Sequence, residues 1–440
     1  MSNKAGKGGL VPRLRFPEFR EAGEWDHSPL SKYVSSLDAG VSVVSGDRPA
    51  KNNEVGILKT SAVTEGVLNP VENKIVLDKD ELQRVKESVS KNSIIISRMN
   101  TPALVGANAY VAQSLDNIFL PDRLWAAKPR RNTSMRFIAL ILGSEKGRAA
   151  LSKLATGTSG SMKNITKPAV LELEIAAPSF TEQQKIADCL ASLDELITLE
   201  AQKLNTLKTH KKGLMQQLFP AEGETLPKLR FPKFRDAGGW EQRELGPLTT
   251  KVGSGITPTG GDKNYNTEGR TFVRSQNVGW GELILNDVAF IDEGTHQSFA
   301  GTEIQLSDVL LNITGASIGR SAVADARIAG GNVNQHVCII RVRQGELHPV
   351  LLNQFLISEH GQKQIDSFQA GGNRQGLNFA QIRSFSIPLP PTENEQCRIA
   401  DCLVSLDDLI SAQAQKLAAL KTHKKGLMQQ LFPVLDEAPA

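Results

Sequence analysis

Two polar loops rich in glycine carry side chains suited to recognition chemistry. They read TGTSGSMKN from Thr156 and AGGNRQGLN from Ala370. Their Asn, Gln, Arg, Lys and Ser side chains form hydrogen bonds, which is the chemistry of noncovalent binding. Neither loop opens a helix after a strand with the glycine spacing of a phosphate-binding loop. These loops therefore predict turns or recognition contacts.

Familiar catalytic motifs are missing from the sequence. It contains no NPPY-type or DPPY-type tetrad of an adenine methyltransferase and no GxxxxGK[ST] loop for ATP. It also contains no HExxH pair. The sequence thus predicts a chain without catalytic activity. The alternative is a nuclease or transferase with an unrecognised site, which would show activity with Mg²⁺ and S-adenosylmethionine.

The most regular element that must position the loops is a long segment present twice. Residues 186–220 recur as residues 399–433 with seven differences, and the last fourteen, LKTHKKGLMQQLFP, are identical. Apolar residues recur at heptad spacing, with interruptions at Glu200 and Lys211. Thr181 and Thr392, each followed by Glu, provide start signals. We therefore predict long helices over 181–220 and 392–433.

Connectivity favours antiparallel pairing of these helices. Only residues 221–227 separate the first helix from the next domain, which runs directly into the second helix. A parallel pair would require that domain to span the whole helix, roughly 50 Å at about 1.5 Å per residue. We predict an antiparallel coiled coil with one variable domain at each end. The alternative is a helical hairpin buried inside one globule.

The segments before the helices also repeat, so the chain is a duplication. RFPEFR and RFPKFR open the two halves, and Trp25 returns as Trp240. Boundaries follow at 1–180 and 221–391 for the variable domains, with a tail at 434–440. The predicted fold class is α+β: two mixed α/β domains, two long helices and an internal pseudo-two-fold.

Short apolar runs in the variable domains, broken by Gly, Asn and Asp, predict strands and turns. LKTSAVTEG from Leu58 corresponds to VRSQNVGWG from Val273, and NSIIISRMN from Asn92 corresponds to SDVLLNITG from Ser307. Helical stretches are expected over 137–154 and 349–368. Divergent loops on two copies of one scaffold imply two ligand specificities, although neutral drift of surface loops is the alternative.

Composition places the chain among globular proteins. It has 440 residues, 40% of them hydrophobic, and a net charge of +4 that permits nucleic acid binding without requiring it. No apolar run of membrane-spanning length occurs, and the polar start lacks the apolar run of a secretion signal. The four cysteines show no CxxC spacing and suggest buried, reduced thiols. We expect a cytoplasmic protein without a membrane partner.

The order of these elements resembles a known family. Two divergent domains, two near-identical helices, the RFP openings, the SIPLPPTENEQ approach to IADCL and the LKTHKKGLMQQLF ends are similar to the DNA specificity subunit of type I restriction-modification systems. The resemblance extends from about Pro12 to Phe432. The first approach, IAAPSFTEQQ, departs from the proline-rich pattern.

The resemblance implies a division of labour. Each variable domain would be a target recognition domain that reads one half of a split double-stranded DNA sequence. The helices would set the gap and dock two methyltransferase subunits, with restriction subunits, the translocases, added to the assembly. Cofactors would then lie on partners: S-adenosylmethionine, ATP and Mg on those subunits, and none on this chain.

Candidate DNA contacts follow from the chemistry of base edges and phosphates. Arg pairs with guanine, and Asn or Gln pairs with adenine, in the major groove, while Lys, Ser and Thr contact phosphates. Low aromatic content argues against stacking platforms for single strands. The candidates, each of which has an ordinary surface role as its alternative, are Arg98, Thr158, Ser159, Ser161, Lys163 and Asn164 in the first domain, and Arg274, Gln276, Asn277, Asn373, Arg374, Gln375 and Asn378 in the second.

Lysines on the repeated helices are candidates for partner docking. Solvated helix faces are the default explanation of such residues. Their retention in both copies makes docking or phosphate contact an equal possibility. The residues are Lys208, Lys211 and Lys212, with Lys421, Lys424 and Lys425. A scaffold whose variable domains bind proteins is the remaining alternative, which sequence-dependent duplex binding would exclude.

Overall fold

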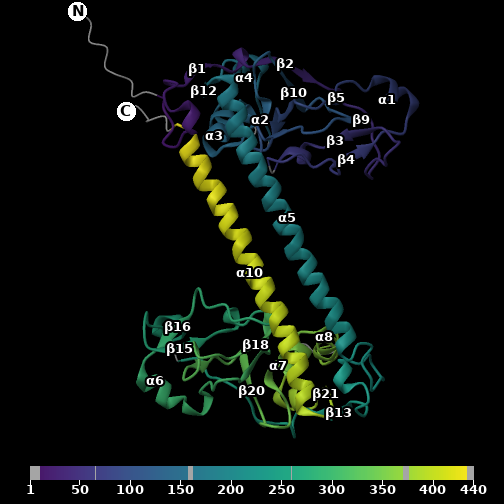
Figure 1. The fold of residues 1–440 in the computed structure, drawn as a ribbon, viewed down its shortest axis with the longest axis vertical. Helices are drawn as coiled ribbons and strands as arrows, with labels where there is room; N and C mark the ends of the chain where they lie inside the picture. The colour runs from purple at the N-terminus through teal and green to yellow at the C-terminus, as the bar shows by residue number, and fades with distance from the viewer. Residues whose placement is uncertain (1–9, 65, 157–161, 259, 370–375, 434–440) are drawn as a thin grey trace, which may run out of the picture. The chain divides into compact units, whose positions relative to one another are not determined.

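The computed structural model describes residues 10–64, 66–156, 162–258, 260–369 and 376–433 (Figure 1). The chain divides into two compact units. The first comprises Met1–Leu199 with Ala418–Ala440, and the second comprises Glu200–Leu417. Each unit therefore contains one variable domain and about half of each long helix. Each compact unit thus includes parts of both helices, whereas the boundaries predicted from the sequence separate the helices from the domains.

The first unit is built on a four-stranded antiparallel sheet. Its strand order is β2 (Val34–Ala39), β10 (Leu124–Pro129), β6 (Ile94–Ser97) and β8 (Asn108–Tyr110). A second sheet has the order β4 (Asn73–Ile75), β3 (Gly56–Leu58), β9 (Leu115–Phe119) and β5 (Ser88–Val89). Beside the sheets, the unit has two strand pairs, β1 (Asp26–Pro29) with β12 (Glu174–Ala177) and β7 (Met99–Asn100) with β11 (Lys163–Asn164). Its short α-helices are α1 (Lys79–Arg84), α2 (Met135–Gly143), α3 (Glu145–Lys153) and α4 (Lys167–Leu171).

The second unit repeats this plan. Its main antiparallel sheet has the order β14 (Thr249–Ser254), β20 (Val337–Val342), β17 (Val309–Asn312) and β18 (Ser321–Val323). A three-stranded sheet has the order β16 (Ala289–Ile291), β15 (Arg270–Val273) and β19 (Asn332–Val333). The remaining elements are β13 (Glu241–Glu244) with β21 (Ser386–Leu389), α6 (Glu293–Ser298), α7 (Pro349–Leu356), α8 (Glu359–Ser367) and α9 (Phe379–Arg383).

The central strands are apolar on both faces because both faces are covered. In β6, Ile94 and Ile96 join the core that contains the helices, whereas Ile95 joins a separate core on the opposite face. In β17, Val309 and Leu310 divide in the same way between two cores. Side chains alternate along a strand, so a continuous apolar run indicates burial on both sides. The predicted strands in NSIIISRMN and SDVLLNITG are confirmed.

The predicted helical stretches 137–154 and 349–368 are each two helices joined at a corner. The Ser144 hydroxyl accepts a hydrogen bond from Gly147 N at 3.0 Å and so caps α3. Ser358 caps α8 through Gly361 N in the same way, at 3.2 Å. A Cβ on Gly147 would lie 2.0 Å from the Ile141 carbonyl oxygen, so the corner requires glycine. The sequence pattern missed these corners because helical periodicity continues on both sides of them.

The long helices are α5 (Phe180–Leu218) and α10 (Glu393–Leu431), each of 39 residues. The Thr392 hydroxyl accepts from Glu395 N at 3.3 Å, which confirms the predicted start of α10. The start of α5 lies slightly earlier than predicted. Ser179, after Pro178, accepts from Glu182 N at 3.4 Å, and Thr181 lies within the helix. Strands β12 and β21 lead into the two helices in the same way, despite their different approach sequences.

Contacts within each unit show that the helices run antiparallel. In the second unit, Lys211 of α5 pairs with Asp407 of α10, and Glu200 pairs with Lys416. Between these two pairs the residue number rises along α10 as it falls along α5, which is the pattern of antiparallel helices. In the first unit, Asp194 of α5 pairs with Lys424 of α10. The predicted antiparallel pairing is confirmed.

Identical helix ends fill equivalent aromatic sockets. In the first unit, the Phe432 ring lies 5.9 Å from Trp25 and 5.5 Å from Phe137, between ring centroids. In the second, the Phe219 ring lies 6.1 Å from Trp240 and 5.9 Å from Phe355. Each helix thus begins beside the domain that precedes it in sequence and ends in the other domain. Aromatic packing of this kind stabilises beyond buried area alone.

An arginine clamp fixes the start of each helix. Arg15 Nε and Nη2 donate to the two Glu182 carboxylate oxygens at 2.8 and 2.7 Å. Arg230 donates to Glu395 at 2.7 and 2.8 Å. Both carboxylate side chains are only 1% exposed. Bidentate geometry of this kind explains why the RFP openings and the helix starts repeat together.

The cysteines are free, but only one is fully buried. Cys338 lies in the core of the second unit, and burial raises the pKa of its thiol to about 12. Cys189, Cys397 and Cys402 are half-buried, so the expectation of buried thiols holds for one of the four. Within the described residues, no helix is long and apolar enough to cross a lipid bilayer.

Candidate functional site

The end of the central strand in each domain lies beside a polar turn and the described end of the glycine-rich loop. We call this region the strand-end site. In the second unit it lies at the end of β17, where Asn312 Nδ2 donates to the Ser275 carbonyl oxygen at 2.8 Å. Ser275 belongs to the 3₁₀ turn Ser275–Asn277 that follows β15. Thr314, two residues beyond β17, bridges to Gly376, near the end of the glycine-rich loop. The turn and the end of the loop are therefore anchored beside one strand.

The first unit has a strand-end site of the same construction at the end of β6. The 3₁₀ turn Thr60–Val63 follows β3 and packs beside β6. Strand β7 continues from β6 and pairs with β11, with Lys163 opposite Asn100. Thr156 bridges to Asn164, so both ends of the polar loop are anchored here.

Three of the first-domain candidates are brought together by this arrangement. The Arg98 carbonyl oxygen accepts from Ile165 N at 2.9 Å, which places it beside Lys163 and Asn164. The Arg98 guanidinium lies 5.7 Å from the Trp125 ring centroid. Its Nε and the Asn164 Oδ1 are buried atoms with no hydrogen-bond partner in the described structure. A cation–π contact thus holds Arg98, while part of its hydrogen-bonding capacity is unused.

In the second domain, Arg274 and Gln276 share one carboxylate. Gln276 Nε2 donates to Asp287 Oδ2 at 2.7 Å, and Arg274 Nη2 lies 3.3 Å from Asp287 Oδ1. The Arg274 guanidinium also lies 5.4 Å from the Tyr265 ring centroid. Gln276 is exposed, and Arg274 is half-buried. These contacts hold both side chains at the surface of the turn.

The equivalent contacts in the first domain involve residues that were not predicted as site residues. Ser61 Oγ donates to Glu72 Oε2 at 2.6 Å, and Lys59 Nζ lies 3.5 Å from the same oxygen. The Ser61 hydroxyl, followed by Lys59, lowers the pKa of Glu72. The repeat offset of 215 relates Lys59, Ser61 and Glu72 to the second-domain trio. Applying that offset to Arg274 and Gln276 would have identified them.

Asn277 has a structural role in the turn. Asn277 is only 1% exposed. Oδ1 accepts from Arg274 N at 2.9 Å, and Nδ2 donates to the carbonyl oxygens of Ile284 and Asp287 at 2.9 and 2.8 Å. The amide is therefore engaged within the protein. Burial, which the sequence does not reveal, separates Asn277 from its exposed neighbour Gln276.

The remaining candidates divide between described and undescribed residues. Asn378 is exposed, and its Oδ1 accepts from Gln381 N at 2.8 Å, so it caps α9. The cap explains this asparagine without a ligand. Thr158, Ser159, Ser161, Asn373, Arg374 and Gln375 lie outside the described residues.

Two of the six candidate docking lysines are engaged between the helices. Lys211 Nζ lies 2.6 and 2.8 Å from the Asp407 carboxylate oxygens, and its side chain is 11% exposed. Lys424 Nζ lies 2.5 Å from Asp194 Oδ1. Interhelix pairing thus accounts for the retention of Lys211 and Lys424, because each neutralises an aspartate of the other helix. Exposed side chains free of this constraint remain at Lys208, Lys212, Lys421 and Lys425.

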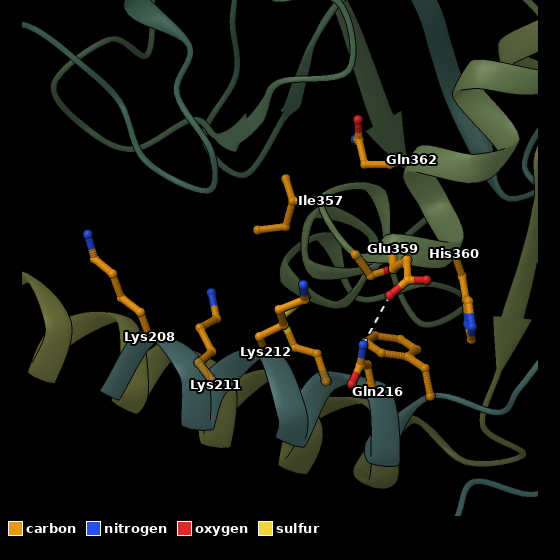
Figure 2. A pocket seen from close by; sticks show the side chains of 11 residues that line it. Lys208, Lys211, Lys212, Gln216, Ile357, Glu359, His360 and Gln362 are labelled. Atoms are coloured by element: carbon orange, nitrogen blue, oxygen red, sulfur yellow. Dashed lines mark hydrogen bonds between the residues drawn. The ribbon is translucent and has the colours of Figure 1, made fainter. Parts of the chain in front are cut away.

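A groove of about 420 Å³ lies in the second unit between the end of α5 and the α7–α8 corner. Figure 2 shows lysines 208, 211 and 212 projecting from α5 on the side of Ile357, and Gln216 meeting Glu359. Gln216 Nε2 donates to Glu359 Oε2 at 3.0 Å. Lys363, followed by Gln216, lowers the pKa of Glu359. The groove combines an apolar floor, including Phe219, with a cationic rim.

In the part of the chain that the structure describes, no group of three His, Cys, Asp or Glu side chains is arranged to hold a metal ion. The chemistry of the strand-end sites and the groove is hydrogen bonding and charge pairing.

Comparison with known proteins identifies the architecture. The family model of the type I restriction modification DNA specificity domain matches residues 43–209 and again residues 239–422. The chain belongs to this family. The two matches correspond to the two halves of the duplication. The presence of two copies of the specificity domain explains why the helices, the arginine clamps and the aromatic sockets each occur twice.

Curated relatives in this family match at low identity but over long segments. The putative type I restriction enzyme MjaX specificity subunit of Methanocaldococcus jannaschii is 22% identical over 409 residues, covering 91% of this chain and 92% of the relative. The type I restriction enzyme HindI specificity subunit of Haemophilus influenzae is 27% identical over 181 residues, covering 41% and 38%.

Solved structures show the same fold. The crystal structure of the type I restriction-modification S subunit from M. genitalium covers 97% of this chain and 100% of its own, with a TM-score of 0.62 at 16% identity. A chain from a structural study of complex assembly and conformational transition in the type I R-M system covers 93% and 97%, with a TM-score of 0.52 at 19% identity.

Proposed function

We propose that this chain recognises double-stranded DNA for a type I restriction-modification complex. Each variable domain reads one half of a bipartite target through its strand-end site. The observation that carries this proposal is the equivalence of the two strand-end sites in construction and their difference in side chains. Family membership of both halves supports the same conclusion. Two sites of one design with different polar groups are suited to two different half-sequences.

The side chains at the strand-end sites have the chemistry for reading base edges. Arg274 and Gln276 can pair with guanine and adenine in the major groove, where bidentate contacts discriminate bases by about 1–3 kcal/mol each. Lys59 and Ser61 occupy the equivalent positions in the first domain. A lysine can pair with guanine and a serine with several bases, and both groups also suit the phosphate contacts that position the protein. The turns are held in shape by Asp287 and Glu72 before DNA binds.

An exchange of domains tests the modular reading. Residues 1–180 are replaced by the corresponding region of a relative, and the modified bases are mapped in a host that carries the hybrid with its methyltransferase. We expect one half of the recognised sequence to change and the other to remain. Replacement of 221–391 is the matched control, with the opposite half changing. A change in both halves after either exchange would contradict independent recognition.

We also propose that α5 and α10 set the gap between the half-sites. One heptad inserted at equivalent positions of both helices keeps the apolar pattern in phase. It adds roughly 10 Å at about 1.5 Å per residue, close to three base pairs at about 3.4 Å per step. The modified sites should show a gap wider by about three base pairs with unchanged half-sites. Seven residues inserted into the exposed linker 221–227 serve as control and should leave the gap unchanged.

We assign partner docking to the exposed lysines retained on the helices. Lys208 and Lys212 rim the groove of the second unit, and Lys421 and Lys425 are their equivalents in the first. Repeated surfaces of this kind suit two copies of one methyltransferase subunit. Restriction subunits, the translocases, join the same assembly. We place S-adenosylmethionine, ATP and Mg on those partners, with no catalysis and no cofactor on this chain, in the cytoplasm and away from membranes.

A further inference from the structure

The repeated helices differ at one buried position. Of the seven differences between the copies, only Glu200 in α5 against Gln413 in α10 changes the charge. These two residues are 8% and 6% exposed. At the other six positions the α10 residue is exposed: Val404, Asp408, Ser411, Ala412, Ala418 and Ala419. Glu200 is also one of the two interruptions in the heptad pattern, so it occupies a core position of the helix pair.

Glu200 and Gln413 are repeat equivalents that meet each other. In an antiparallel pair of like helices, one position must lie opposite its own counterpart, and here the offset of 213 places 200 opposite 413. Gln413 Nε2 donates to Glu200 Oε2 at 2.5 Å and to the Glu200 carbonyl oxygen at 3.0 Å. Lys416 Nζ donates to Glu200 Oε1 at 2.5 Å. Both carboxylate oxygens are therefore satisfied by α10.

The helix ends cannot distinguish one helix from the other. Segments 207–220 and 420–433 are identical, and Phe219 and Phe432 enter sockets of the same aromatic composition. If two copies of the first half of the chain paired, the end of α5 from one copy would enter the Trp25 socket of the other. That end has the same sequence as the end of α10, which fills the socket in the native chain. Any preference for unlike helices must come from the differing positions. Among these, only 200 and 413 are buried in both copies.

Pairing of like helices would spoil this position. Two α5 helices would bring Glu200 against Glu200. The Oε2 atoms, which accept from Gln413 in the native pair, would then face each other with no amide hydrogen between them. The two Lys203 side chains, the repeat equivalents of Lys416, could donate only to the Oε1 atoms. Carboxylates that share a site repel unless one is protonated. Two α10 helices would place Gln413 against Gln413 and leave Lys416 without its carboxylate.

We propose that Glu200 and Gln413 select the pairing of α5 with α10 over the pairing of like helices from two copies of the chain. A single buried polar position can specify partners in a coiled coil even at some cost in stability. The partner that fits the centre of α5 is therefore the centre of α10. Two different variable domains are kept together on one helix pair. This inference does not depend on what the domains bind.

The test uses the full chain with a protease site placed at the exposed linker residues 222–224. After cleavage, the helix contacts alone hold the halves together. The halves are loosened in denaturant and returned to buffer at neutral pH, and native mass spectrometry counts unlike and like pairs. The native sequence is compared with E200Q, with Q413E and with the E200Q/Q413E double variant, in which the two residues exchange places.

The native halves should recover as unlike pairs. Both single variants make position 200 equal to position 413, so every pairing becomes equivalent and about half of the complexes should be like pairs. The double variant should recover unlike pairs, because Lys203 then serves the carboxylate at position 413 as Lys416 serves Glu200 in the native chain. If Q413E does not refold, E200Q and the double variant decide the result.

A purely stabilising role gives a different pattern. E200Q would then lower the yield of complexes while all of them remained unlike pairs. That outcome, or like pairs in the native sample at the level of about half, would overturn the proposal.

Discussion

The aromatic sockets and the strand-end turns lie in the same units and compare very differently across the duplication. Each socket uses one Trp and two Phe residues at similar ring distances in both units. The two turns share an arrangement in which two polar side chains contact one carboxylate, but the residues differ. Lys59 and Ser61 contact Glu72, whereas Arg274 and Gln276 contact Asp287. The difference teaches that the same carboxylate support can carry different surface groups. Contacts that hold the scaffold are repeated, and groups that it displays are changed.

Truncation of the socket phenylalanines should produce the largest effect. Phe219→Ala removes a ring that is 1% exposed, and we expect a loss of about 3–5 kcal/mol in the free energy of unfolding. Phe432→Ala removes a half-buried ring and should fall at the lower end of that range. Urea unfolding of each variant measures both losses.

Gln217→Ala, which changes an exposed residue two positions before Phe219, is the matched control and should change stability by less than about 0.5 kcal/mol. A loss for Phe432→Ala larger than that for Phe219→Ala would show that the two sockets are less alike than their ring distances indicate.

Replacement of a turn residue should affect DNA and not folding. Arg274→Ala removes a side chain that can read guanine, so discrimination in one half-site should fall by about 1–3 kcal/mol. Binding to duplexes that vary one half-site at a time measures this. Arg327→Ala, which removes an exposed arginine paired with Asp325 in the same unit, is the control and should leave discrimination unchanged. Equal weakening on every sequence would instead assign Arg274 to phosphate contact.

How far the sequence could predict the molecule depends on whether the signal repeats. The helices, their pairing and the strands were predictable because heptads and apolar runs occur twice in the same order. Glu200 and Lys211 interrupt the heptad pattern. They are the polar contacts between the helices, and a core position carrying a charge could have indicated a partner. The α2–α3 and α7–α8 corners were missed because a single serine cap interrupts otherwise continuous helical periodicity.

The candidate site was less predictable than the fold. Residue type suggested Asn277 and Gln276 equally, but burial commits the first to the turn and leaves the second exposed. Lys59 and Ser61 carry no recognisable motif, and only their equivalence to Arg274 and Gln276 singles them out. Side-chain chemistry is visible in the sequence, whereas exposure depends on packing that residues far apart in the chain supply.

Two neighbouring lysines should give the smallest and most selective effects. Lys211→Met breaks the pair with Asp407, which is 36% exposed and also accepts from Gln354, so we expect a loss of only about 1 kcal/mol. Lys208→Met should leave stability unchanged because Lys208 is exposed. Urea unfolding compares the two variants.

Charge reversal separates docking from folding at the same positions. Lys208→Glu should weaken one methyltransferase docking event, and Lys208→Glu with Lys421→Glu should weaken both, because the two lysines are repeat equivalents. Native mass spectrometry of the assembled complex counts the bound copies. Saturation with a single methyltransferase in the native complex would contradict two equivalent docking surfaces.

The identical helix ends also have a consequence for inheritance. The coding stretches for the identical segments 207–220 and 420–433 specify the same peptide, so genetic crossover within them joins one variable domain to another without altering the Phe that enters each socket. A recombinant chain would therefore still fold around intact helix ends. New combinations of domains can arise in a single genetic event, and natural selection then acts on the combination and not on the repair of a damaged core.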